Sequence, residues 1–179
     1  RHEKIFTSRD EEGSVEYVNY LSEVPLSSGS FTLMARTNGY VSEMANYLRS
    51  NGFKYSRNGK SSLSDDLVGN ILTWDTLCQD ESVGVQQIKA LYSGVKKQGK
   101  DAVVRRGSTQ MLDALAPEDM LDMDTLIKDY GLQRDASTSA YDVLNVSSSE
   151  RDYIDAIFRR GEDLLSSPRI KVSTFHAMK

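Results

Sequence analysis

The stretch IKVSTFHAMK, residues 170–179, decides the fold expected for this chain. Apolar Ile170 and Val172 alternate with polar Lys171 and Ser173, as residues do in a strand with one buried face. Side chains that carry chemistry often lie where such a strand ends, and here hydroxyl and imidazole groups follow one another. The sequence therefore predicts a β-strand that ends in a polar site. Because the chain stops within that site, we expect it to be a piece of a longer protein.

A second stretch, FTLMARTN at residues 31–38, predicts a partner for that strand. Its first five residues form a nearly continuous apolar run, which is typical of a strand buried in a parallel sheet. The run is broken by Arg36, Thr37 and Asn38. A second polar group is therefore expected at a strand end.

Residues 39–56 predict a helix and a further strand. Ser42 is a favourable N-cap, and four apolar residues follow the helical spacing: Val41, Met44, Ala45 and Leu48. The pair Asn51-Gly52 predicts a left-handed end to this helix. A short strand is then expected at residues 53–56.

The N-terminal residues predict the same alternation of strand and helix. Residues 4–8 are a strand candidate. Ser14 precedes an apolar stripe of Val15, Val18 and Leu21, which predicts a helix that ends before Pro25.

From residue 64 to about residue 167 the pattern predicts helices only. The last helix is marked by a capping box, Ser147-x-x-Glu150, and Pro168 is expected to separate it from the final strand. Four apolar stripes at helical spacing predict core packing, for their aromatic side chains as well. The first consists of Leu67, Val68, Ile71, Leu72, Trp74 and Cys78, and the second of Val85, Ile88, Tyr92 and Val95. The third consists of Met120, Met123, Ile127 and Tyr130, and the fourth of Ile154, Ile157, Phe158 and Leu165.

The composition is that of an ordinary globular protein, with 179 residues, 39% of them hydrophobic and 27% charged. No run approaches the roughly 18 apolar residues that a membrane span needs, and no signal peptide is recognisable. We therefore expect no membrane partner and a cytoplasmic location. The single cysteine, Cys78, excludes a disulfide framework and is expected to be a buried thiol.

The net charge of −4 argues against a domain that coats itself with nucleic acid, because phosphate binding needs a clustered basic surface. Any contact with DNA is therefore expected to be local. The densest basic run, at residues 96–100 with Arg105 and Arg106 beyond it, is more often a solvated face than a binding site.

Two segments, in the right order, resemble the superfamily 1 helicases of the UvrD, Rep and PcrA type. LMARTN at residues 33–38, followed by a helix and by NGFKY at 51–55, is similar to the L-x-R-T-N…G-(I/F)-x-Y stretch of that family's second RecA-like domain. VSTFHAMK at residues 172–179 is similar to the family's motif V, T-x-H-x-x-K-G-x-E. The resemblance covers the whole chain in layout, and its motifs cover about twenty residues.

The resemblance implies an α/β fold with a partial RecA-like parallel sheet, of the kind found in the second domain of P-loop NTPase-type helicases. Residues 1–63 and 168–179 would form that sheet, and residues 64–167 would be a mostly α-helical insertion. The implied parent is an ATP-dependent DNA helicase of DNA repair or replication, which translocates on single-stranded DNA and unwinds duplex. Its implied partners are single-stranded and junction DNA, the other helicase domains of the same chain and, through the insertion, a protein.

The same resemblance assigns roles to residues at the two strand ends. Ser173, Thr174 and His176 would contact the DNA strand, and Arg36, Thr37 and Asn38 would form another part of the same DNA-binding floor. Guanidinium, hydroxyl, amide and imidazole groups can all donate to phosphate oxygens without reading bases. Lys179 would lie nearest the nucleotide.

The resemblance also implies ATP and Mg²⁺ as cofactors of the parent. The sequence contains no G-x-x-x-x-G-K-[ST] phosphate loop, and the glycine and glutamate that complete motif V do not follow Lys179. We therefore expect this chain alone to bind neither cofactor and to be inactive as an ATP hydrolase, with no complete catalytic set and no metal site.

Other interpretations remain open from the residues alone. Asn38-Gly39 can be a turn, His176 a satisfied strand-end histidine and Arg36 a surface charge. The chain can also be a non-enzymatic helical adaptor that binds DNA or a protein. A different nucleotide-binding enzyme would need a Gly-rich turn after the first strand, and residues 8–13 do not supply one.

Two further patterns have little support. His2 and His176 lie at opposite ends of the chain, without the spacing of metal ligands. Residues 105–109, RRGST, resemble the Gly-rich turn with which helicase relatives touch duplex DNA, but the second glycine of that pattern is missing.

Overall fold

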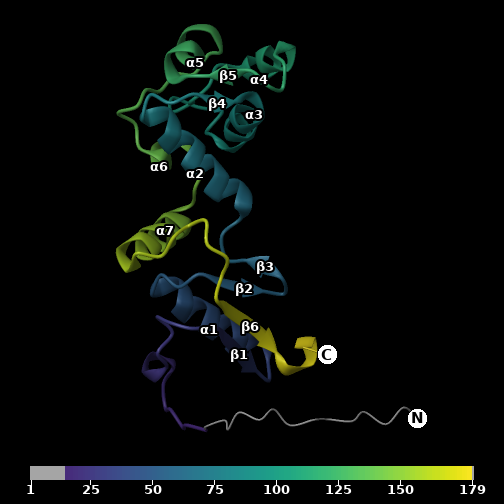
Figure 1. The fold of residues 1–179 in the computed structure, drawn as a ribbon, viewed down its shortest axis with the longest axis vertical. Helices are drawn as coiled ribbons and strands as arrows, with labels where there is room; N and C mark the ends of the chain where they lie inside the picture. The colour runs from purple at the N-terminus through teal and green to yellow at the C-terminus, as the bar shows by residue number, and fades with distance from the viewer. Residues whose placement is uncertain (1–14, 179) are drawn as a thin grey trace, which may run out of the picture.

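A computed structural model describes residues 15–178 of the chain, with side chains up to His176. The fold is mixed α/β, and Figure 1 shows it as an elongated molecule with a sheet at one end and a group of short helices at the other. We call residues 65–144 the helical part. The sheet part consists of the four-stranded sheet with the two helices that lie nearest to it.

The sheet is formed by strands that are far apart in the sequence. Its strands are β1 (Phe31–Ala35), β6 (Ile170–Thr174), β2 (Tyr55–Arg57) and β3 (Lys60–Ser61), in that spatial order. β6 lies between β1 and β2 and runs parallel to both, and β3 is antiparallel to β2. The predicted return of the final strand to the sheet is therefore confirmed.

Helix α1 (Asn38–Ser50) connects β1 to β2 and packs on the sheet through Val41, Ala45 and Leu48, all of which are buried. The helix begins earlier than the sequence predicted. Thr37, not Ser42, is its N-cap, and the Thr37 hydroxyl accepts a hydrogen bond from the Tyr40 amide at 3.4 Å. The hydroxyl of Ser42 instead accepts a hydrogen bond from Arg57.

Helix α7 (Ser148–Arg160) packs against α1, and its capping box at Ser147 and Glu150 is confirmed. The Tyr153 hydroxyl donates to the Phe53 carbonyl at 2.8 Å, and Gly52 meets the α7 backbone so closely that a Cβ there would overlap the Ala156 carbonyl. The range 64–167 expected for the insertion therefore includes a helix that shares its core with the sheet. The prediction that Phe158 and Leu165 pack in the core is wrong, because 51% and 70% of their surfaces are exposed.

The return from α7 to β6 is fixed by Lys54. This residue is 4% exposed, and its Nζ donates to the carbonyls of Asp163, at 2.9 Å, and Leu164, at 2.6 Å, and to the Ser166 carbonyl. Three backbone acceptors before β6 are thus satisfied by the side chain of the residue that precedes β2.

The helical part is not purely helical, which corrects the prediction. It contains α2 (Asp65–Cys78), α3 (Val85–Gly94), α4 (Ser108–Met111), α5 (Met123–Asp129) and α6 (Ala140–Val143), with a 3-10 turn at Leu112–Ala114. It also contains a two-stranded antiparallel sheet, formed by β4 (Val83–Gly84) and β5 (Met120–Leu121). Met120 therefore lies in a strand and is exposed. Trp74 and Tyr92 are buried, as predicted.

The segment before β1 differs from its prediction. Residues 4–8 lie outside the described residues. From residue 15 onward only a 3-10 turn, Leu21–Glu23, forms before Pro25, and Val15 and Val18 are exposed. Of the apolar stripe in this segment, only Leu21 packs against the core, so a helix would gain little burial there.

Cys78 is partly buried against the core of the helical part. Burial and the neighbouring carboxylate of Asp75 raise the pKa of its thiol. Within residues 15–178, no helix is both long enough and apolar enough to cross a membrane.

Candidate phosphate-binding site at the strand ends

Three neighbouring strands of the sheet end at the same edge. β1 and β6 are parallel and in register, with Ala35 beside Thr174, so Arg36 and Phe175 leave the sheet side by side. β2 runs in the same direction on the other side of β6 and ends at Arg57. Because parallel strands place their carboxyl ends together, this edge collects the polar residues that follow each strand.

A hollow opens at this edge, between the end of β6 and the beginning of α1. We call it the strand-end hollow, and its lining residues are Arg36, Thr37, Tyr40, Phe175 and His176. Tyr40 and Phe175 are exposed over 60% and 52% of their surfaces. The hollow therefore combines cationic and hydroxyl donors with two aromatic rings that solvent can reach.

The first turn of α1 contributes to the electrostatics of the hollow. The N-terminus of a helix carries a partial positive charge of about half an elementary charge, with amides that point out of the helix. Thr37 caps this terminus, and α1 has 13 residues. The described residues that line the hollow include no carboxylate, so the helix end and Arg36 act in the same direction on an anion.

The structure brings together three of the six predicted DNA-binding residues: Arg36, Thr37 and His176 line the hollow. Asn38 is the first residue of α1 and does not line it. Lys179 lies outside the described residues.

The other two predicted residues lie on β6, outside the lining of the hollow. Ser173 is 9% exposed, and its hydroxyl donates to the Thr174 carbonyl at 3.1 Å. Thr174 itself is half-buried. Both residues belong to the strand that leads to His176.

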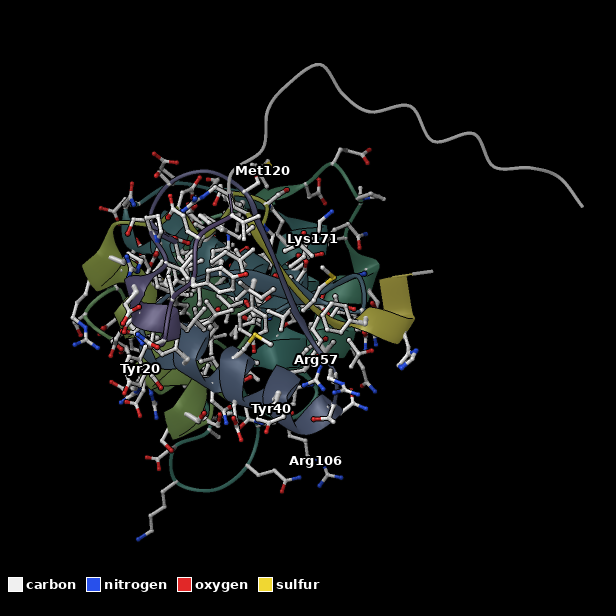
Figure 2. The ribbon with its side chains drawn as sticks, turned by 90° about the horizontal axis from the view of Figure 1, so that it is seen from below. Tyr20, Tyr40, Arg57, Arg106, Met120 and Lys171 are labelled. Carbon is white, nitrogen blue, oxygen red and sulfur yellow. The ribbon has the colours of Figure 1, made fainter. Side chains whose placement is uncertain are left out.

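Sequence reasoning missed three residues of this edge. Tyr40 and Phe175 are separated by 135 positions in the sequence and meet only because β1 and β6 pair. Arg57 ends β2, and its Nη1 donates to the Ser42 hydroxyl of α1 at 3.3 Å. Figure 2, which views the molecule from below, shows Tyr40 and Arg57 in the same part of the view. Arg57 could have been found from the sequence, because it directly follows the strand predicted at residues 53–56.

Among the described residues, the cationic groups at this edge form no ion pair with an acidic neighbour. The ion pairs found between residues 15 and 176 are Lys89–Asp113, Arg151–Asp142 and Arg169–Glu162, and none involves Arg36 or Arg57. A free anion would therefore meet guanidinium groups that still carry their full charge.

Among the described residues there is no group of three or more His, Cys, Asp or Glu side chains that could hold a metal ion. A Mg²⁺ ion that bridges phosphates usually relies on one or two carboxylates, and the lining of the strand-end hollow supplies none.

The RRGST segment lies in the helical part. Arg105 and Arg106 are exposed, and Gly107 adopts a left-handed conformation ahead of α4, with φ +89°. The hydroxyl of Ser108 is buried without a hydrogen-bond partner among the described residues. The helix that follows has only four residues, so it offers no extended N-terminal site.

Comparisons of this chain with protein-family models, with curated proteins and with solved structures found no match.

Proposed function

We propose that this chain is part of an ATP-dependent DNA helicase, from a RecA-like second domain, and that its strand-end hollow binds the backbone of single-stranded DNA. The proposal rests on the resemblance of LMARTN and VSTFHAMK to helicase motifs. One observation carries it further. The two motifs are far apart in the sequence, yet β1 and β6 pair in parallel and place Arg36 and His176 around one hollow.

The chemistry of the hollow suits a phosphodiester backbone. The Arg36 guanidinium presents a fork of donors to phosphate oxygens, and an imidazole N–H of His176 can donate to the same group or the next one. Tyr40 and Phe175 offer exposed ring faces on which bases can stack. Such contacts do not distinguish base sequence, as translocation along DNA requires.

This chain would supply one half of the DNA path and none of the ATP chemistry. The parent's remaining domains would hold ATP and Mg²⁺, which supply the hydrolysis that drives movement. Within this chain, Arg36 and His176 follow the paired strands β1 and β6. A movement of the whole sheet would therefore carry both groups together along the DNA.

The test is fluorescence anisotropy of labelled oligo(dT) over a range of salt concentrations, with the chain and an Arg36→Ala, His176→Ala variant. We expect weak binding that falls with salt, and a loss of about tenfold in the variant, since each charge-assisted hydrogen bond contributes about 1.5–3 kcal/mol before solvent screening. The salt slope should also fall by about 0.7 for each lost phosphate contact.

A matched control removes two cations from the helical part, Lys128→Ala with Arg134→Ala, and should leave binding unchanged. Tripolyphosphate serves as a second ligand, because the same donors could hold a free polyphosphate. Tripolyphosphate binding that depends on Arg36, without oligo(dT) binding, would contradict the DNA assignment. Equal binding of oligo(dT) by the unmodified chain and by the Arg36→Ala, His176→Ala variant would contradict it as well.

A further inference from the structure

A second basic surface lies at the other end of α1. Between the C-terminal half of α1 and the length of α7 runs an open groove, which we call the arginine groove. It is formed by two adjoining hollows that share Ser50 and Arg159, and their lining residues are Asn46, Arg49, Ser50, Asn51, Ser149, Asp152, Tyr153, Ala156, Arg159 and Arg160. Because α1 has 13 residues, the arginine groove and the strand-end hollow are about 20 Å apart.

Two of its three guanidinium groups are held in place by uncharged partners. Arg49 lies over the ring of Tyr153, with Cζ 4.5 Å from the ring centroid. Arg160 lies over the ring of Phe53 at 3.5 Å, and its Nε donates to the Asn51 carbonyl at 2.9 Å. These contacts restrict the side chains and leave their charge in place.

Arg159 is exposed, and its Nε donates to the Asp155 carbonyl of its own helix at 3.3 Å. None of the three arginines takes part in an ion pair within the described part of the chain. The C-terminal ends of α1 and α7 offset some of the positive charge of the arginines, because each helix end carries about half a negative elementary charge. The carboxylates of Asp152 and Glu150 also lie nearby, and the charge of Arg49 contributes to the lowered pKa of Glu150. Within the described residues, however, none of the ion pairs joins a carboxylate to these three arginines.

The arrangement favours an acidic peptide over a nucleic acid strand. The rings of Tyr153 and Phe53 are covered by arginines, so they offer no face on which a base could stack. Asp152 interrupts the basic surface, whereas a nucleic acid strand brings one charge with every nucleotide. Separate guanidinium forks with serine and asparagine donors between them match carboxylates that alternate with neutral residues.

We propose that the arginine groove is a docking site for an acidic segment of a partner protein, bound through carboxylates on Arg49, Arg159 and Arg160. The site is independent of the strand-end hollow and does not rest on the helicase assignment. An acidic segment docked there would leave the edge that carries Arg36 and His176 uncovered.

The test uses a fluorescein-labelled peptide of alternating Glu and Ser, and a matched peptide of alternating Gln and Ser, in anisotropy titrations with the chain. We expect the Glu peptide alone to bind, in a salt-sensitive manner. An Arg49→Gln, Arg159→Gln variant should lose at least about fivefold in affinity, because two of the charge-assisted contacts are removed. Lys128→Gln with Arg134→Gln is the charge-matched control and should bind as the unmodified chain does.

Circular dichroism of each variant establishes that it is folded, and the single Arg159→Gln variant, at an exposed position, provides a second measurement. Absence of Glu peptide binding, equal binding of the Gln peptide or an equal loss in the control pair would each overturn the proposal. Oligo(dT) binding that depends on Arg49 and Arg159 would assign the groove to nucleic acid and would overturn it too.

Discussion

At the residue scale, Lys54 determines how the chain enters β6. Its ammonium group is enclosed by the carbonyls of Asp163, Leu164 and Ser166, and its backbone amide donates to the Glu162 carboxylate at 3.3 Å. These acceptors come from the segment between α7 and the strand that carries His176. The buried side chain of Lys54 therefore holds the segment that leads into β6 against the residue that precedes β2.

We predict that Lys54→Met destabilises the protein by about 1–3 kcal/mol, because the methionine fills similar space but leaves buried carbonyls without a donor. Urea unfolding followed by circular dichroism measures this change. Lys171→Met is the control, since Lys171 lies on β6 with an exposed side chain, as Figure 2 shows. Equal stabilities of the two variants would show that the Lys54 contacts contribute little.

At the element scale, the contact between α1 and α7 depends on the glycine that ends α1. Gly52 has φ +68°, and the carbonyl of Ala156 occupies the space where a Cβ would lie. Gly59, in the turn between β2 and β3, has a similar φ of +76° but has no atom within 4 Å of a Cβ position. A comparison of alanine substitutions at Gly52 and Gly59 therefore distinguishes the cost of backbone strain from the cost of steric overlap.

Gly59→Ala should cost about 1–2 kcal/mol, the usual penalty for a left-handed conformation in a residue with a side chain. Gly52→Ala carries the same penalty and must also push α7 away from α1, so its cost should be clearly larger. Thermal and urea unfolding of the two variants measure the difference. Closely similar losses would mean that α7 is not held against α1 as described.

The capping box of α7 predicts a pH dependence of stability. Hydrogen bonds from Ser147 lower the pKa of Glu150 from its ordinary value of 4.5. A carboxyl whose pKa is lower in the folded state contributes stability above the unfolded pKa, and this contribution is lost as the pH falls through the folded pKa.

Glu150→Gln should therefore be less stable than the unmodified protein at pH 7, by about 0.5–1 kcal/mol after allowance for solvent screening, and the difference should shrink below pH 4.5. Urea unfolding at both ends of this range measures it. Glu118→Gln, an exposed change of equal charge with no hydrogen bond among the described residues, is the control. A difference that persists at low pH would contradict the role assigned to the ionised carboxylate.

Local signals predicted those elements that the structure confirms. The apolar run of β1, the apolar stripe of α2 and the capping box of α7 depend on neighbouring residues, and a sequence displays them directly. The beginning of α1 was misplaced because Thr37 and Ser42 are both good caps, and only the position of β1 selects Thr37.

Non-local packing explains what the sequence could not predict. Phe158 follows the apolar stripe of α7, but no element covers that position and the side chain remains exposed. The short strands β4 and β5 are too brief to show alternation, so Met120 was assigned to a helix. At the site, Arg36 and His176 were found through their motifs, whereas Arg57, Tyr40 and Phe175 required the sheet order.

At the scale of the whole molecule, β6 completes a sheet whose other strands come from the beginning of the chain. The helical part is inserted between β3 and α7 and lies at the far end of the molecule from β1, as Figure 1 shows. The insertion therefore leaves the strand-end edge open. On our account, this edge contacts single-stranded DNA, and the helical part is free to contact something else.

The central claim is tested most directly by locating the DNA on the protein. Oligo(dT) with bromodeoxyuridine substitutions is cross-linked to the chain by ultraviolet light, and the attached peptides are identified by mass spectrometry. The account predicts cross-links within residues 36–40 and at Phe175 and His176, around the strand-end hollow. Cross-links confined to residues 96–107 or to α7 would contradict it.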